Sequence, residues 1–287
     1  MRVKGTVHNQ TTGAAPCRAL RRIFCRACRP MVAVLLLLMA TGAAHAQSVF
    51  IEELTWPELR SRVAAGSTIA LVPTGGTEQG GPHLALGKHS VVVREAARRI
   101  AVQLGNALVA PVIPVVPEGP LDRPAANLAF PGTLGLSDDT YAAVLRDIAT
   151  SLALSGFKLI CFIGDHGQSQ AVQARVAIEL NAGALPAGVR VIHVASYYAP
   201  ADEDRELARA GVPAKALGDH AGVGDTAVTL AVRPGAVRMQ KRSASAWNET
   251  GSSGASGRPE LATQSMGEKL LRQRVARTVT EIRAQLR

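Results

Sequence analysis

Apolar runs and amphipathic stretches alternate along the chain, and this alternation predicts the fold. The apolar runs are rich in β-branched residues and predict strands at residues 69–73, 107–116, 158–163 and 189–197. Stretches with apolar positions at helical spacing predict helices at residues 90–104, 137–154, 170–180 and 263–286. Because strands that alternate with helices usually join into a parallel sheet, the pattern predicts an α/β fold, with a mostly parallel sheet flanked by helices.

Two of these predicted helices also carry end signals. Ser137 is a typical N-cap residue, and Asp138 and Asp139 follow in the first turn, where the helix dipole favours acidic side chains. Gly105 and Gly156 stand where the first two helices should stop, and glycine is the usual residue at a helix C-terminus. These signals fix the expected boundaries of both helices.

Residues 1–46 predict an export signal peptide. An arginine-rich stretch without acidic residues runs into an apolar segment, residues 32–40, and then into Ala-His-Ala at residues 44–46, a small-x-small cleavage pattern. The Arg-Arg pair at residues 21–22 resembles a twin-arginine signal, and the ordinary secretory route stays open. The short apolar segment and the cleavage pattern disfavour a retained membrane helix. We therefore expect cleavage before Gln47 and export to the periplasm.

Cleavage would change the charge of the chain. The whole sequence has 32 Lys+Arg and 22 Asp+Glu, a net charge of +10, and the predicted signal contains 7 of the basic residues and none of the acidic ones. The remaining 25 basic and 22 acidic residues leave a net charge of +3. A nucleic-acid-binding protein needs a basic face on its folded domain, so this function class is not supported.

The same cleavage would leave Cys161 as the one cysteine, so the exported chain could form no internal disulfide. Apolar neighbours on both sides of Cys161 indicate a buried structural thiol rather than a nucleophile. The remaining length of about 240 residues suits one domain, residues 47–287. Within it, residues 243–257 are rich in Ser, Gly and Ala and predict a mobile surface loop.

The segment at residues 73–89 is the strongest candidate for chemistry. It combines a carboxylate, two imidazoles and five glycines directly after an apolar strand-like run. Glycine allows the tight turns that place side chains at a strand end, and Glu and His are residue types that bind a zinc-like ion. His166 follows another predicted strand, and strands of a parallel sheet end at the same edge. Glu78, His89 and His166 are therefore predicted to meet there, although His89 taken alone also fits a helix cap or a surface position.

The same segment resembles the signature of the creatininase (creatinine amidohydrolase) family, which reads roughly G-S-T-E-Q-H-G-P-H-L-P-L-G-T-D. Residues 130–133 resemble the family's F-P-G-T, and residues 220–227 resemble its H-A-G-x-x-E-T-S. His166-Gly167 stands at the family's N-G-H-G-G-N, and residues 257–268 resemble its closing segment. The resemblance covers residues 50–285 and implies the family's three-layer α/β sandwich, with a metal site that hydrolyses amides through metal-activated water.

The resemblance also implies a specific change at the metals. The family binds two ions, and its ligands stand at the positions of Glu78, Gly80, His89, His166 and Gln168. Here glycine replaces a ligand histidine at position 80, histidine replaces a bridging aspartate at position 89, and glutamine replaces a glutamate at position 168. All three changes would weaken the second ion's site. We therefore expect one divalent ion held by Glu78, His89 and His166, with zinc first and manganese or iron as alternatives.

The resemblance assigns roles near the substrate as well. His220 is the candidate for donating a proton to the leaving nitrogen, and Asp219 stands beside it near the substrate. Asp225 aligns with the family's glutamate and would support the same loop. Gln168 is then a weak neutral donor near the metal site or the substrate.

Three further residues keep two interpretations each. Asp165 could orient a ligand imidazole or coordinate the ion, or it could cap its loop. His83 could contact substrate or hold its own loop by a hydrogen bond. Arg258 could meet a substrate carboxylate or remain a solvated loop residue.

The resemblance implies an exported, metal-dependent amidohydrolase acting on an amide or cyclic amide C–N bond of a small molecule. The lost ligands and the export signal argue against creatinine as the substrate. The alternative is a catalytically inactive binding or scaffold protein of the periplasm that keeps the fold. By resemblance we also expect a homo-oligomer, as a hexamer, and no nucleic-acid partner.

Overall fold

The computed structural model describes residues 48–183, 185–241 and 253–286. The predicted signal peptide, residues 1–46, therefore lies outside the described residues, as does most of the loop predicted at residues 243–257. Among the described residues, no helix is long and apolar enough to cross a membrane.

The centre of the domain is a parallel sheet of four strands in the order β2-β1-β5-β6. Each pair is parallel, and β1 pairs along its whole length with β5, from Ile69 beside Leu159 to Thr74 beside Gly164. A second parallel pair joins β3 and β4. The strands are β1 (Ile69–Thr74), β2 (Ala107–Val109), β3 (Val116–Pro117), β4 (Gly135–Leu136), β5 (Leu159–Gly164) and β6 (Arg190–His193).

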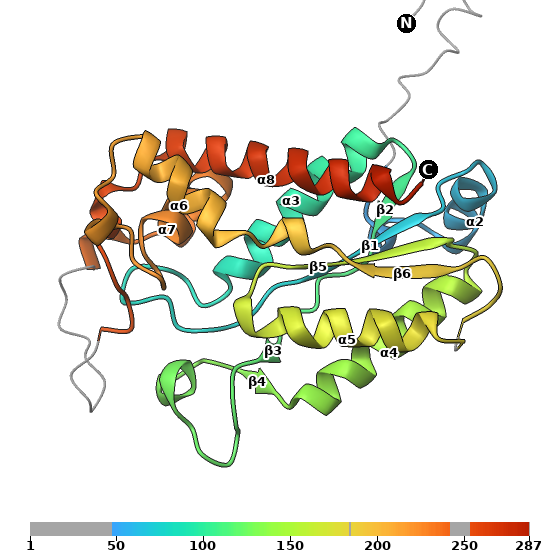
Figure 1. Cartoon of the computed structure of the whole chain (residues 1–287), viewed down its shortest axis with the longest axis horizontal. Coiled ribbons are helices and arrows are strands. Elements are labelled where there is room, and N and C mark those ends of the chain that lie inside the picture. Colours follow the sequence, from blue (N-terminus) through green and yellow to red (C-terminus); the bar gives the residue numbers. More distant parts are fainter. Residues whose placement is uncertain (1–47, 184, 242–252, 287) are drawn as a thin grey trace, which may run out of the picture. The chain divides into compact units, whose positions relative to one another are not determined.

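Helices cover both faces of this sheet and make three layers (Figure 1). On β1, Ala70 and Val72 belong to the apolar core shared with α4 and α5, whereas Ile69 and Leu71 belong to the core shared with α3 and α8. Both faces of the central strands β1 and β5 are buried, which explains their unbroken apolar runs in the sequence. The helices are α2 (Trp56–Ala64), α3 (Lys88–Leu104), α4 (Asp138–Leu154), α5 (Gln170–Asn181), α6 (Pro200–Arg209), α7 (Val223–Val232) and α8 (Gln264–Ala284).

The end signals read from the sequence are confirmed. The Ser137 hydroxyl accepts a hydrogen bond from the Thr140 N–H at 3.2 Å and caps α4. Gly105 follows α3 in the left-handed conformation, with φ of 82°, which glycine adopts without strain. The α/β fold with a mostly parallel sheet flanked by helices is confirmed as well.

Two of the predicted strands are shorter than their apolar runs. The run at residues 107–116 gives β2 and β3 in place of one strand, because Pro111 and Pro114 have no N–H to donate to a neighbouring strand. The run at residues 189–197 forms β6 and then a short 3₁₀ turn, Ala195–Tyr197. The helices α2, α6 and α7 were not predicted.

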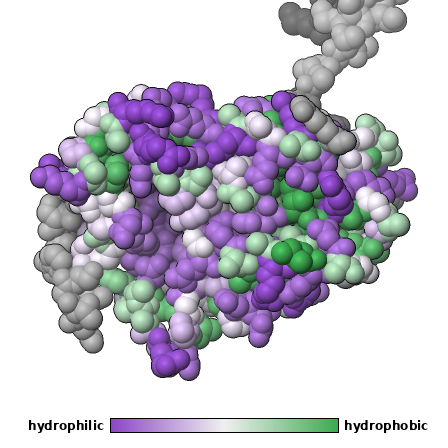
Figure 2. Space-filling view, in the orientation of Figure 1, coloured by the Kyte–Doolittle hydropathy of each residue, from purple (hydrophilic) through white to green (hydrophobic). Residues whose placement is uncertain are grey.

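The loops that follow β1 and β5 leave the sheet at neighbouring strand ends, as expected for paired parallel strands. The loop after β1 carries Glu78 and leads into α3, and the loop after β5 carries Asp165 and His166 and leads into α5. Helices α7 and α8 pack against each other, and α7 also contacts α3. Hydrophilic residues gather in Figure 2 around and below α6 and α7. Cys161 lies on β5 and is fully buried, in agreement with its predicted structural role.

Candidate metal centre

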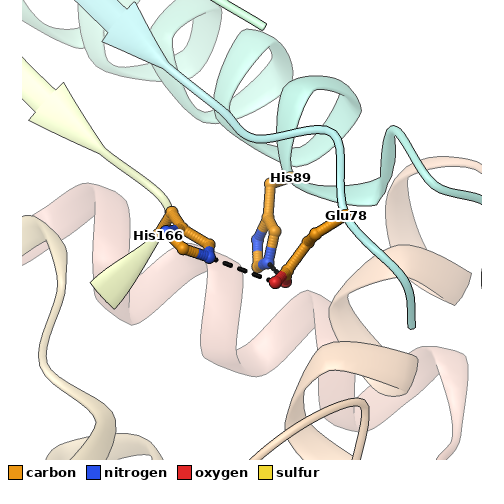
Figure 3. Close-up of side chains that lie close together, drawn as sticks. All are labelled: Glu78, His89 and His166. Carbon is orange, nitrogen blue, oxygen red and sulfur yellow. Dashed lines mark hydrogen bonds and ion pairs between the residues drawn. The ribbon is translucent and has the colours of Figure 1, made fainter. Parts of the chain in front are cut away.

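Glu78, His89 and His166 lie together although they come from three different elements (Figure 3). Nε2 of His89 is 2.7 Å from Oε1 of Glu78, and Nε2 of His166 is 3.1 Å from Oε2 of the same carboxylate. One ligand atom from each of the three residues fits within a span of 4.8 Å, and all three residues are buried. The loops after β1 and β5 and the start of α3 therefore bring together the three residues expected from the sequence.

This donor set fits a divalent metal ion. Two imidazoles and one carboxylate are a ligand set of catalytic zinc sites, which leave one coordination position open. Nδ1 of His89 faces Oδ2 of Asp165 at 2.9 Å, so that Nε2 points toward Glu78 and His166. A ligand histidine in a zinc site typically has such a carboxylate or carbonyl on its other ring nitrogen.

Asp165 is itself held from two sides. Its Oδ1 accepts hydrogen bonds from the Tyr197 hydroxyl, at 3.0 Å, and from Nη1 of Arg274. Arg274 also binds Glu203 through Nε and Nη2, each at 2.9 Å. Of the interpretations given above for Asp165, its contacts match the one that orients a ligand imidazole.

Three residues that the sequence analysis did not single out also contact the centre. Nζ of Lys88 is 2.6 Å from Oε1 of Glu78, and only 1% of the Lys88 side chain is exposed. Oε1 of Glu118 lies 3.2 Å from Nε2 of His166. Asn127 donates hydrogen bonds from Nδ2 to Oε2 of Glu78 and, at 3.3 Å, to Oε2 of Glu118. A sequence signal existed for Glu118, which directly follows an apolar run and β3; none existed for the burial of Lys88.

A cavity of about 400 Å³ opens onto Glu78, His89 and His166. His220 lines it, with Nδ1 4.0 Å from Oε1 of Glu78 and 27% of its side chain exposed. Gln168 and Asp219 also line the cavity and are both exposed. Asp225 lines it too, and its Oδ2 accepts a hydrogen bond from the Ala221 N–H at 2.8 Å, in keeping with a loop-supporting role.

Two of the predicted residues lie elsewhere. His83 is buried, and its Nε2 is 3.0 Å from the Thr226 hydroxyl, which ties its loop to α7. Arg258 is 61% exposed and pairs with Glu260 at 3.0 Å. Neither lines the cavity, so the geometry matches the loop-holding interpretation of His83 and the solvated interpretation of Arg258.

The charges at the centre shift its titrating groups. Burial disfavours the ionised form of Glu78, but hydrogen bonds with His166 and His89 and the charge of Lys88 hold its pKa well below the usual range. Burial also disfavours the ionised form of His166 and by itself would lower its pKa. Hydrogen bonds with Glu118 and Glu78 outweigh this effect and raise the pKa of His166 to about 9. In the metal-free protein a proton on His166 therefore compensates the two carboxylates that face it.

The stability of the metal-free protein should fall as the pH rises. The pKa of His166 is about 9 in the folded chain against an ordinary value of 6.5, so its protonation stabilises the fold fully below pH 6.5. This contribution, at most about 3 kcal/mol, is lost as the pH rises through 9. Thermal unfolding of chelator-treated protein from pH 6 to 10 should show the loss, and His166→Gln should flatten the profile. An unchanged melting temperature across this window would contradict the prediction.

Comparison with known proteins gives the same family that the motifs suggest. The sequence pattern of the family described as creatinine amidohydrolase matches residues 52–282. The creatinine amidohydrolase of Pseudomonas putida is 29% identical over 201 residues, which cover 68% of this chain and 76% of the relative. The mycofactocin precursor peptide peptidase of Mycolicibacterium smegmatis is 27% identical over 216 residues, which cover 72% of this chain and 81% of the relative.

Solved structures share the fold. A creatininase variant of a Zn–Zn type superposes with a TM-score of 0.67 at 24% identity, over 83% of this chain and 98% of the other. Another solved creatininase is a manganese form. The family match spans nearly the whole described domain, and the motif loop, the sheet and the Glu/His/His cluster lie within it. The chain therefore belongs to the creatininase family.

Proposed function

We propose that the chain is a metal-dependent amidohydrolase that cleaves an amide or cyclic amide C–N bond of a small molecule. The observation that carries the proposal is the cluster of Glu78, His89 and His166 at a cavity of about 400 Å³. A divalent ion bound there would supply Lewis-acid activation of water and of the amide carbonyl. Amidohydrolase relatives in the same family support this class of reaction.

The residues of the chain would prepare this site in defined ways. Glu78, His89 and His166 would hold the ion, because they are the described residues whose ligand atoms converge. Asp165 would keep His89 oriented through its hydrogen bond to Nδ1. Asn127, which donates to Oε2 of Glu78, would fix the carboxylate plane. The open side of the cluster faces the cavity, where an amide could enter.

His220 would supply the proton for the leaving nitrogen, and its ring is held by contacts with Gln79. The Gly81 N–H donates to Oε1 of Gln79 at 2.9 Å, which fixes the Gln79 amide with its NH₂ group toward Nε2 of His220, at 2.8 Å. The same Nε2 lies 3.1 Å from the backbone carbonyl oxygen of Gln79. Nδ1 of His220 faces Glu78 across 4.0 Å, at the wall of the cavity. General-acid catalysis of this kind contributes typically about 10²–10⁴ in rate.

The test is turnover by zinc-loaded protein on a panel of amides. The panel should contain creatinine, other small cyclic amides and short peptides, because the relatives named above act on creatinine and on a precursor peptide. We expect hydrolysis of an amide other than creatinine, and loss of at least about 100-fold in rate with His220→Ala. Metal-loaded protein that binds members of the panel but hydrolyses none would favour the binding or scaffold function instead.

We also propose that the chain is exported and forms a homo-oligomer. Both proposals rest on the sequence: the signal-like pattern in residues 1–46, and the family resemblance. Fractionation of expressing cells with N-terminal sequencing of the product checks the first, and we expect a mature terminus at Gln47. Light scattering of the purified protein checks the second. A chain that keeps residues 1–46 or a strictly monomeric protein would contradict the respective proposal.

A further inference from the structure

Lys88 has no part in the proposed chemistry, yet its ammonium group lies inside the metal centre. Its Nζ is 2.6 Å from Oε1 of Glu78, and the same oxygen is 2.7 Å from Nε2 of His89. Lys88 is the first residue of α3, and His89 is the second. The lysine therefore shares a carboxylate oxygen with a predicted ligand of the metal ion.

This position is unfavourable for a cation in two respects. The side chain is 1% exposed, so the ammonium has lost its hydration, which is costly unless a counter-charge replaces it. It also stands in the first turn of α3, where the positive end of the helix dipole repels cations. A residue that only filled space would be apolar here. The charge itself must therefore be what the site uses.

The surroundings contain an excess of carboxylates. Arg274 is the one arginine among the described residues that line the cavity, and it already pairs with Asp165 and Glu203. Among the described residues, Lys88 is the lysine or arginine whose side chain contacts Glu78 directly. The carboxylates that line the cavity are Glu78, Asp165, Glu203, Asp204, Asp219 and Asp225.

The lysine stem also occupies the space beside position 80. A Cβ atom built on Gly80 would lie 3.2 Å from Cδ of Lys88 and 2.9 Å from Cβ of Leu84, both closer than ordinary contacts. A ligating side chain at position 80 would therefore crowd Leu84 and push the Lys88 stem away from its place. The lysine stem passes beside the Cα atom of Gly80, and its ammonium group reaches Glu78.

We propose that the Lys88 ammonium is a built-in counter-ion of the centre, fixed on Oε1 of Glu78, and that the centre consequently takes one divalent ion. This inference rests on the metal binding that is part of the proposed function, and it does not require that the protein hydrolyses a substrate. The ammonium balances the charge of Glu78 on one side, and it repels any further cation there. It also repels the ion bound by Glu78, His89 and His166 and so lowers the affinity for it.

The test is zinc binding by the full chain. After zinc supply and gel filtration, mass spectrometry of the wild-type protein should give one zinc ion per chain. Lys88→Met keeps most of the stem and removes the charge, and chelator competition should then show zinc bound at least about tenfold more tightly, because repulsion between neighbouring like charges is relieved. A lysine that served only to position Glu78 would give the opposite sign, weaker binding in the variant.

Two further variants keep this test decisive. Lys158→Met removes an exposed lysine and should leave the zinc affinity unchanged. Lys88→Gln, which can still donate a hydrogen bond to Glu78, should also tighten zinc binding and replaces Lys88→Met if that variant does not fold. Two zinc ions per wild-type chain, or unchanged or weaker affinity in the Lys88 variants, would overturn this inference alone. No zinc in the wild-type protein would overturn the metal centre of the proposed function with it.

Discussion

Replacing Glu78 with glutamine should abolish zinc binding and, with it, hydrolysis. Glu78 is the only carboxylate in the Glu/His/His cluster of the described residues, and it contacts both histidines. Glutamine has nearly the same shape but only a neutral oxygen as a donor, which is a poor zinc ligand. We expect zinc per chain to fall from one to near zero after gel filtration, measured by mass spectrometry, and turnover to fall with it.

The same substitution should destabilise the protein, because it leaves Lys88 as a buried ammonium without its carboxylate. Breaking a buried ion pair from one side typically costs about 3–5 kcal/mol. Chemical unfolding of the metal-free proteins measures this term. The double variant Glu78→Gln/Lys88→Met removes both charges and should recover most of the stability but none of the zinc binding. The comparison of the single and double variants then separates the loss of zinc binding from the loss of stability.

Glu118→Gln is the matched control. Glu118 is also buried and faces His166 at 3.2 Å, but it lies outside the cluster whose ligand atoms converge. We expect this variant to keep one zinc ion per chain, with affinity reduced by no more than about 100-fold, as for partners that only orient a ligand. Glu78→Gln protein that retains one zinc ion, or Glu118→Gln protein that loses it, would show that the ligand assignment is wrong.

The fold could be predicted from the sequence because the central strands are buried on both faces. Such strands give continuous apolar runs, as in β1 and β5, and these are easy to recognise. The helix caps at Ser137 and Gly105 are local signals that hold in three dimensions. The division of the run at residues 107–116 was also visible in principle, since Pro111 and Pro114 cannot donate to a strand partner.

The candidate site could be predicted only in part. Glu78 and His166 follow strands, and the edge rule for parallel sheets brings such residues together. Lys88 was missed because charged residues in polar segments are usually exposed, and its burial depends on how distant segments pack. Glu118 could have been found, because it directly follows an apolar run. The spacing of residues in the sequence also could not decide whether Arg258 faces the substrate or the solvent, because this depends on how its loop folds.

Arg274→Met should weaken both the fold and the metal centre. Arg274 is buried on α8 and pairs with Asp165 through Nη1 and with Glu203 through Nε and Nη2. Methionine fills a similar volume but leaves two carboxylates without their main cation. We expect a loss of about 3–5 kcal/mol in the free energy of unfolding, which corresponds to a melting temperature lower by on the order of 10 °C.

The effect should reach zinc because Asp165 links Arg274 to His89. Without the arginine, Oδ1 of Asp165 keeps only the Tyr197 hydroxyl, so the carboxylate that orients His89 through Oδ2 is less well fixed. Loss of such an outer partner typically costs about 10–100-fold in metal affinity, which chelator competition on the folded variant measures. Because the ion itself stabilises the fold, zinc should raise the melting temperature of the variant less than that of the wild type.

Arg272→Met provides the control on the same helix. The Arg272 side chain is 66% exposed and lies 3.9 Å from Glu268, so its removal should change stability by less than about 1 kcal/mol and leave zinc affinity unchanged. If Arg274→Met lowers stability while zinc affinity stays at the wild-type value, then Tyr197 alone suffices to hold Asp165. The chain from α8 through Asp165 to His89 would then serve the fold and not the metal centre.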